Sequence, residues 1–220
     1  MGQGASETAT FTQALASLKR TGSNILLVGA AGDAQHGACS RLLGDESEAP
    51  RERLLVSVGA TAVDERIQDG TTVIEYEQET RSAAASASPA ADSGPEPARY
   101  QTVTDLASLG REMEAAITEA TRRPGGLEPA QLRVCVDSLR PLLEEHGEEP
   151  TFHFLHGITR EIEAARGMGH FHLPVSYDDS AVRTLVPLFD AVIEVRTRGD
   201  GREQRWHLRE AGLVTDWLPL

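Results

Sequence analysis

The sequence predicts an α/β protein with a mostly parallel sheet, flanked by helices on both faces and extended by antiparallel strands near the C-terminus. Three observations predict this class. Apolar runs of strand length alternate with amphipathic segments of helical period. A glycine-containing stretch, VGAAGDAQHGACS at residues 28–40, follows the first apolar run. A GDG turn then separates the last alternating unit from two short strand-like segments.

The elements follow from local spacing. Phe11, Leu15 and Leu18 recur at helical intervals, and TGS ends that helix before a buried strand at residues 25–28. A short helical segment is predicted at residues 40–44. Further helices are predicted at residues 106–120, 152–165 and 180–186, the first capped by Thr104 or Asp105. Further strands are predicted at residues 53–59, 71–77, 132–137, 169–175, 190–196, 203–210 and 212–220.

The chain is expected to form one domain over residues 1–220. Residues 82–98 consist almost entirely of Ala, Ser, Pro and Gly, with no large apolar side chain. Such a segment cannot bury enough surface to offset its ordering entropy, which predicts a disordered internal loop. The alternating pattern resumes after it, so this loop is not expected to divide two domains.

Composition restricts the location and the partners. The net charge of −13 opposes binding to a phosphate backbone, which disfavours direct contact with nucleic acid. No run approaches the roughly 18 apolar residues of a membrane helix. Two cysteines are too few for a disulfide framework, which indicates a reducing, cytoplasmic setting. Lys19 is the only lysine, and this acidic, arginine-using composition is similar to that of proteins from extreme halophiles.

Residues 32–39 occupy the place of a phosphate-binding loop, directly after the first strand. A working loop has the pattern G-x-x-x-x-G-K-[ST], in which Lys reaches the phosphates and the hydroxyl binds Mg²⁺. Gly32 and Gly37 match its glycines, but Ala38 replaces the lysine and Cys39 replaces the hydroxyl residue. We therefore predict a vestigial nucleotide site, with no bound cofactor or at most weakly bound Mg·ATP.

Asp137 is the remaining residue of this predicted site. A carboxylate directly after an apolar strand, as in RVCVD, is the position that orders Mg²⁺ in nucleotide hydrolases. An aspartate at a strand end also commonly caps the following turn. The sequence leaves both interpretations open.

The motifs GSNILLVG, RVCVDSL, FLH, GHFHLPV, LFDAVIEVR and TDWLPL resemble an uncharacterised haloarchaeal family within the KaiC/GvpD/RadA-like branch of the RecA superfamily. The resemblance extends from about Phe11 to Leu220, apart from residues 82–98. It implies a RecA-like sheet, ATP binding and hydrolysis at subunit interfaces. Asp137 matches a functional position of the superfamily, whereas the acidic residue expected after the second strand is replaced by Gly59 and Ala60. The superfamily also has a basic finger residue near the C-terminal end of the domain, and here Arg209 is the residue that matches it.

Several polar and aromatic residues have two interpretations. His170 and His172 alternate on one strand, and His153 and His156 lie three apart on a helix. Ligand pairs have such spacings, but no third ligand is evident, so we interpret these histidines as packing or hydrogen-bonding residues and predict no metal site. Cys39 is interpreted as a small filler, with a reactive thiol as the alternative. Trp206 and Trp217 lie in the predicted terminal strand pair, where each is expected to anchor a core or cover a sheet edge, with a role as a partner-binding hot spot as the alternative.

The resulting functional hypothesis is a RecA/KaiC-like domain without hydrolysis and without catalytic residues. It would act as a regulatory or signalling module through a protein partner, with self-association as a further option. The alternative is a nonstandard Mg-dependent ATP-binding protein or weak ATPase that uses Asp137.

Overall fold

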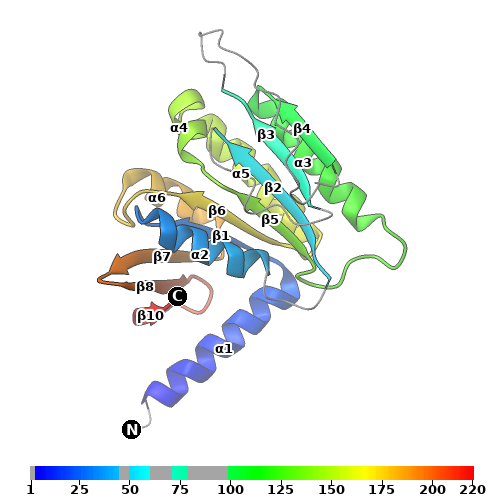
Figure 1. Ribbon diagram of the computed structural model, residues 1–220. Helices are drawn as coiled ribbons and strands as arrows, with labels where there is room; N and C mark the ends of the chain where they lie inside the picture. Colours follow the sequence, from blue (N-terminus) through cyan, green and yellow to red (C-terminus); the bar gives the residue numbers. More distant parts are fainter. Residues whose placement is uncertain (1–2, 45–49, 60–70, 79–98) are drawn as a thin grey trace.

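A computed structural model describes residues 3–44, 50–59, 71–78 and 99–220. A ten-stranded sheet runs through the molecule in the order β10-β8-β7-β1-β6-β5-β2-β3-β4, with β9 paired to β8 (Figure 1). The strands are β1 (Ser23–Val28), β2 (Glu52–Val58), β3 (Thr72–Tyr76), β4 (Arg99–Val103), β5 (Leu132–Val136), β6 (Met168–Leu173), β7 (Ala191–Arg198), β8 (Gly201–Leu208), β9 (Leu213–Val214) and β10 (Leu218–Pro219).

The predicted fold class is confirmed by this sheet. All pairings from β7 across to β4 are parallel, whereas β8 pairs antiparallel with β7, β9 and β10. β1 lies between β6 and β7, and β6 separates β1 from β5. The carboxyl ends of β1 and β5, where ligands of open α/β sheets bind, therefore lie at the same edge, one strand apart.

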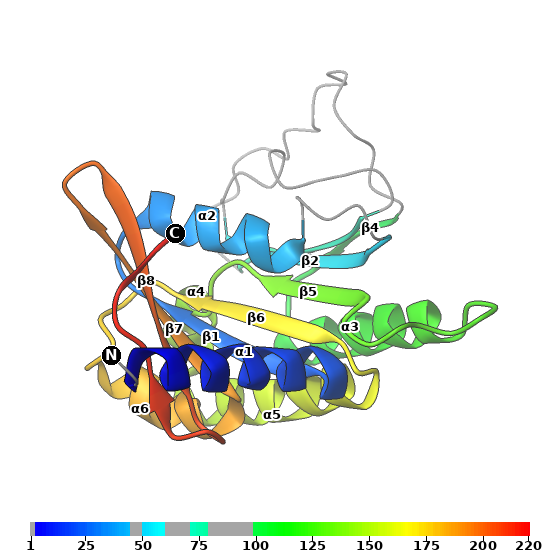
Figure 2. The ribbon, with the colours of Figure 1, turned by 90° about the horizontal axis from the view of Figure 1, so that it is seen from below.

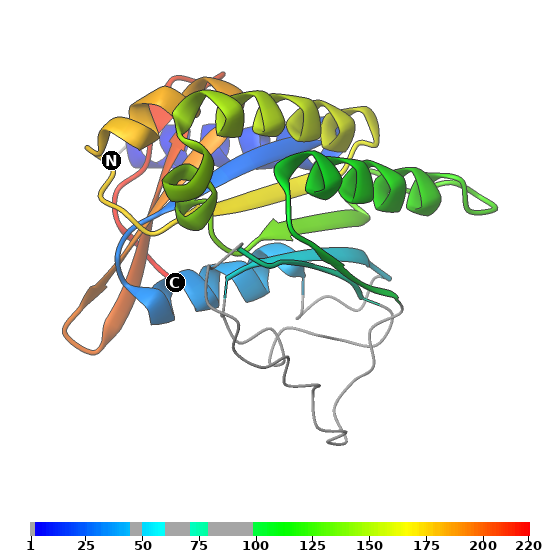
Figure 3. The ribbon, with the colours of Figure 1, turned by 90° about the horizontal axis from the view of Figure 1, so that it is seen from above.

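Helices cover both faces of the sheet (Figures 2 and 3). They are α1 (Gln3–Thr21), α2 (Gly32–Leu43), α3 (Leu106–Thr121), α4 (Arg140–His146), α5 (Glu148–Ala164), α6 (Ser180–Leu185) and the 3-10 helix η2 (Val186–Leu188). One face packs against α3, α4, α5 and α6 in the main core, around Leu26, Met113 and Phe171. The other face packs against α2 and α1 in two smaller clusters.

Four elements differ from the prediction, the last of which is the strand predicted at residues 212–220, where the structure has two short strands, β9 and β10. α2 begins at Gly32 rather than near residue 40, because Ala34, Ala38 and Leu43 are buried at helical spacing against the sheet. β4 was not predicted because, of its five residues, only Val103 is buried, which leaves a weak apolar pattern at the sheet edge. α4 was also not predicted, since it is short and its buried residue is Leu142 alone.

Other local predictions agree with the structure. The Asp105 side chain caps α3 by accepting a hydrogen bond from the Ser108 N–H at 2.8 Å. Asp179 caps α6 in the same way, through Ala181. The predicted loop at residues 82–98 lies outside the described residues. Among the helices that are described, none is both long and apolar enough to cross a membrane.

Candidate functional site

The connection between β1 and α2 is too short to wrap around a phosphate group. β1 ends at Val28 and α2 begins at Gly32, so three residues separate them. The predicted site residues Gly32, Gly37, Ala38 and Cys39 all lie inside α2. The stretch that aligns with a phosphate-binding loop is therefore helical along its whole length.

The polar groups of this connection are already used within the protein. The Gly29 N–H donates to the Val175 carbonyl at 2.9 Å, and the Gln35 side-chain amide donates to the Gly29 carbonyl. A phosphate-binding loop instead directs its backbone N–H groups toward the ligand. Gly29 has φ of 125° and lies so close to β7 that a β-carbon would sit 2.1 Å from the Val195 carbonyl oxygen. The turn is thus closed against β7.

Of the four α2 site residues, the two that carry side chains, Ala38 and Cys39, are buried. Ala38 is 2% exposed and packs in the cluster beneath α2, so the position expected for a phosphate-binding lysine points into the core. Gly37 lies beside the side chains of Arg202 and Leu220. Gly32 is exposed in the first turn of the helix, where nothing lies within 4 Å of the position of a β-carbon.

Asp137 connects the ends of two neighbouring strands. It follows β5 and is 7% exposed. Its carboxylate accepts hydrogen bonds from the Val58 N–H at 2.8 Å and from the Ser57 hydroxyl at 3.2 Å, both at the end of β2. These contacts join the Asp137 carboxylate to the end of the neighbouring strand β2, rather than to the turn that follows Asp137 itself.

We predict that Asp137→Ala lowers the free energy of unfolding by about 2 kcal/mol, because it leaves the buried Val58 N–H without its acceptor. Asp137→Asn should lose less, since its amide oxygen can still accept from Val58. Urea denaturation followed by circular dichroism measures both variants. Equal stability of wild type and Asp137→Ala would contradict this structural role.

Arg209 is also used within the chain. Its guanidinium donates to the carbonyls of Pro187 at 2.9 Å and Phe189 at 2.8 Å, where the chain leaves η2. This arrangement explains an arginine here without a neighbouring subunit.

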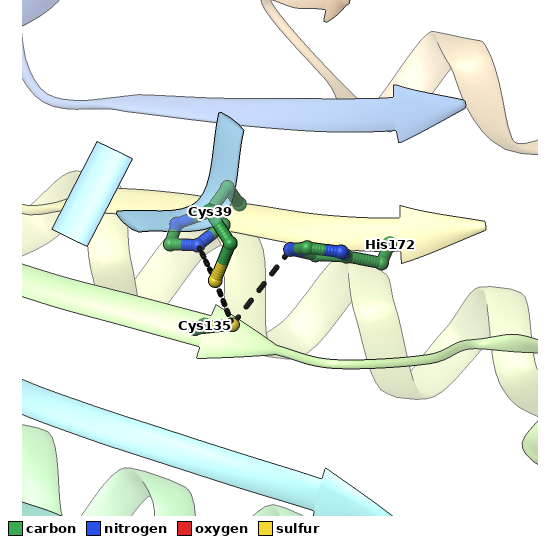
Figure 4. Close-up of side chains that lie close together, drawn as sticks. Cys39, Cys135 and His172 are labelled. Atoms are coloured by element: carbon green, nitrogen blue, oxygen red, sulfur yellow. Dashed lines mark hydrogen bonds between the residues drawn. The ribbon is translucent and has the colours of Figure 1, made fainter. Parts of the chain in front are cut away.

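The structure brings together four residues that the sequence interpretation had kept apart. Cys39 projects from α2 toward the sheet, where it contacts Cys135 of β5, and Cys135 in turn contacts His172 of β6 (Figure 4). His170, on the same face of β6 as His172, completes the group. Their ligand atoms all lie within 4.8 Å of one another, and all four side chains are buried.

The surroundings of this cluster shift the pKa values of two of its members. Hydrogen bonding with Cys135 holds the pKa of the Cys39 thiol well below its usual range, against the opposing effect of burial. Burial lowers the pKa of His170, which favours the neutral imidazole. A thiolate and a neutral imidazole are the forms that bind metal ions.

The sequence contained a signal for this cluster, but only together with the strand order. The H-x-H pattern places two imidazoles on one face of β6, and Cys135 lies opposite His170 on the adjacent β5. The adjacency of β5 and β6 brings Cys135 to the histidines, and the early start of α2 brings Cys39. His153 and His156, by contrast, are exposed on α5.

The tryptophans contribute to packing. Trp206 is 9% exposed and makes an edge-to-face contact with Phe11 of α1, with ring centroids 5.8 Å apart. Trp217 lies against the guanidinium of Arg196, whose central carbon is 3.7 Å from the ring centroid. Both contacts agree with an anchoring role at the C-terminal strands.

A separate cavity of about 390 Å³ lies between α1, the end of α2 and the sheet. Its lining includes Arg41, Arg51 and Arg133. Burial, together with the nearby charges of Arg51 and Arg53, lowers the pKa of Arg133 to about 10. Arg133 belongs to the first half of β5, so this cavity lies away from the carboxyl ends of the strands.

Comparison with solved structures identifies the class of fold. The KaiC-like protein PH0186 from the hyperthermophilic archaeon Pyrococcus horikoshii OT3 superimposes with a TM-score of 0.55 over 90% of this chain and 85% of that chain, at 11% identity. The sheet and its flanking helices thus define a protein with the KaiC-like, RecA-type fold.

The sequence comparison then gives the family. Residues 22–195 match the model of DUF7504, a family of unknown function, and the chain belongs to this family. The comparison with curated proteins gives no match.

Proposed function

We propose that this chain is a KaiC-like domain that does not hydrolyse nucleotide and acts as a regulatory or signalling module through contacts with other proteins. The observation that supports this proposal most directly is the connection between β1 and α2. It is three residues long, and its Gly29 N–H donates a hydrogen bond to the Val175 carbonyl. Nucleotide hydrolases of this fold class place their phosphate cradle at this connection.

The residue chemistry supports the same proposal. Lysine and a hydroxyl residue supply the charge and the Mg²⁺ ligand of a phosphate-binding loop. Here Ala38 and Cys39 replace them, and both are buried. The Asp137 carboxylate is hydrogen-bonded to Ser57 and Val58, which competes with a role in ordering Mg²⁺. The missing lysine and hydroxyl, together with an Asp137 carboxylate that is already hydrogen-bonded, favour a domain that kept its fold for another purpose.

The net charge restricts the partner. A charge of −13 favours a protein partner with a basic surface over direct contact with nucleic acid. A partner of this kind would be recovered by pull-down in a salt-dependent manner. Self-association is the second option, and light scattering of the purified chain would detect it.

We predict that Mg·ATP at millimolar concentration does not raise the melting temperature of the protein. A ligand present at 100 times its Kd and bound only to the folded state would stabilise it by about 2.7 kcal/mol, which is visible as a shift in melting. The measurement is a thermal melt in concentrated KCl, with and without Mg·ATP, for wild type and for Asp137→Asn.

A shift in wild type that disappears in Asp137→Asn would contradict the proposal. It would support the alternative of a Mg-dependent ATP-binding protein that uses Asp137, and release of phosphate would then be measured. Because Asp137→Asn is expected to melt slightly earlier without ligand, each variant is compared with its own ligand-free melt.

A further inference from the structure

We propose that Cys39, Cys135, His170 and His172 bind one Zn²⁺ ion, which fixes α2 to the centre of the sheet. The four residues come from three elements: α2, β5 and β6. Within the described part of the chain, they form the one group of three or more Cys, His, Asp or Glu side chains placed to hold an ion.

Three of the six distances between the ligand atoms match those around a tetrahedral ion, and all six are within 4.8 Å. Zn²⁺ binds thiolates at about 2.3 Å and imidazoles at about 2.0–2.1 Å, so the edges of a regular Cys₂His₂ tetrahedron are about 3.3–3.8 Å. The two sulfurs, of Cys39 and Cys135, are 3.4 Å apart. Cys39 Sγ lies 3.4 Å from His170 Nε2, and Cys135 Sγ lies 3.8 Å from His172 Nε2.

The donor set selects the kind of metal. Two sulfurs and two imidazole nitrogens in tetrahedral placement are characteristic of Zn²⁺, whereas Ca²⁺ and Mg²⁺ require oxygen ligands. Two thiolates also balance the charge of a divalent ion, so the loaded site would bring no net charge into the core. Each ligand would be deprotonated or neutral when bound.

The burial of the four ligand side chains indicates a structural ion and not a catalytic one. The exposed fractions are 0% for both cysteines, 1% for His170 and 3% for His172. Four protein ligands close the coordination shell, whereas a catalytic zinc keeps one position for water or substrate. The site therefore has no position for a reaction, and its effect is to join distant parts of the chain.

The place of the site in the fold gives it a specific consequence. α2 is the helix that follows β1, and in a nucleotide-binding domain the start of this helix receives the phosphates. Here the middle of the same helix would be held to β5 and β6 by the metal. The zinc would thus stabilise the packing of α2 on the sheet independently of any nucleotide.

The first test measures the metal content of the purified protein. Untagged protein, produced in zinc-supplemented medium and purified without chelators, should contain one Zn²⁺ per chain by plasma mass spectrometry. Cys39→Ser and Cys135→Ser should each reduce this value at least about tenfold, since the loss of a thiolate weakens a Cys₂His₂ site strongly. His153→Ala and His156→Ala, on the exposed face of α5, are the matched controls and should retain the metal.

The second test uses wild-type protein, so it remains informative if the cysteine variants do not fold. After removal of the metal by a chelator under reducing conditions, the melting temperature should fall by more than about 5 °C and recover when Zn²⁺ is added. Reconstitution with Co²⁺ should give the intense visible bands of a tetrahedral ion and a thiolate-to-metal charge-transfer band.

Three results would overturn the proposal. The first is wild-type protein without metal that also fails to give the Co²⁺ spectrum. The second is metal that remains in a folded Cys39→Ser/Cys135→Ser double variant, because the ion would then lie elsewhere. The third is a Cys39–Cys135 disulfide in protein isolated under conditions that block thiol oxidation, seen as resistance of both thiols to alkylation without reductant after the protein has been unfolded in the presence of a chelator.

Discussion

Gly29→Ala is expected to destabilise the protein by about 3–5 kcal/mol, a loss comparable with the total stability of many domains. Gly29 has φ of 125°, a conformation essentially restricted to glycine, and the added methyl group would lie 2.1 Å from the Val195 carbonyl oxygen. Because that oxygen belongs to the backbone of β7, the clash cannot be relieved by a side-chain rotation. Either the turn moves away from β7 or β7 moves.

Gly32→Ala is the matched control. Gly32 lies three residues further on, in the first turn of α2, with no positive φ and with open space at its β-carbon position. Alanine is a better helix former than glycine, so this variant should be unchanged or up to about 1 kcal/mol more stable. Urea denaturation followed by circular dichroism measures both. A destabilising Gly32→Ala together with a tolerated Gly29→Ala would contradict the tight turn described at Gly29.

Phe171→Ala is expected to cost about 3–5 kcal/mol, because it removes a fully buried ring from the main core. Phe171 packs against Phe189, with ring centroids 5.4 Å apart. Phe152, which is only partly buried against the same core, is the control, and its replacement by alanine should cost less. Equal losses in the two variants would contradict the packing described here.

Phe171 also tests the separation between the two faces of β6. It lies between His170 and His172 in the strand, but its side chain projects to the opposite face. Phe171→Ala protein that still folds should therefore retain one Zn²⁺ per chain. Substitution of Phe171 would then lower stability without loss of metal, whereas substitution of the adjacent His170 or His172 would remove a metal ligand.

The sequence was sufficient to predict the inner strands because they carry continuous apolar runs. β1 and β6 are buried along their whole length, and GHFHLPV and NILLV are evident as strands without further information. β4 and α4 were missed because each buries a single apolar residue: Val103 and Leu142. An edge strand and a short helix are stabilised mainly by tertiary contacts, so the local sequence shows little apolar pattern that would predict them.

The site was harder to predict because the role of Cys39 depends on where α2 begins. In the aligned sequence, Gly32 and Gly37 match the glycines of a phosphate loop, and Cys39 is a substitution within it. Once these residues are helical, Cys39 becomes a buried side chain that faces Cys135. The two cysteines are 96 positions apart, so only the strand order and the start of the helix bring them together.

The end of the sheet after β1 is closed by protein contacts, and we propose a metal ion beneath α2 in place of a nucleotide at the start of this helix. The most direct measurement is a crystal structure obtained in the presence of Mg·ATP, with anomalous data collected on both sides of the zinc absorption edge. We predict an anomalous peak between Cys39, Cys135, His170 and His172, and no triphosphate at residues 29–31. A triphosphate bound at residues 29–31, with no zinc peak in the cluster, would contradict this account.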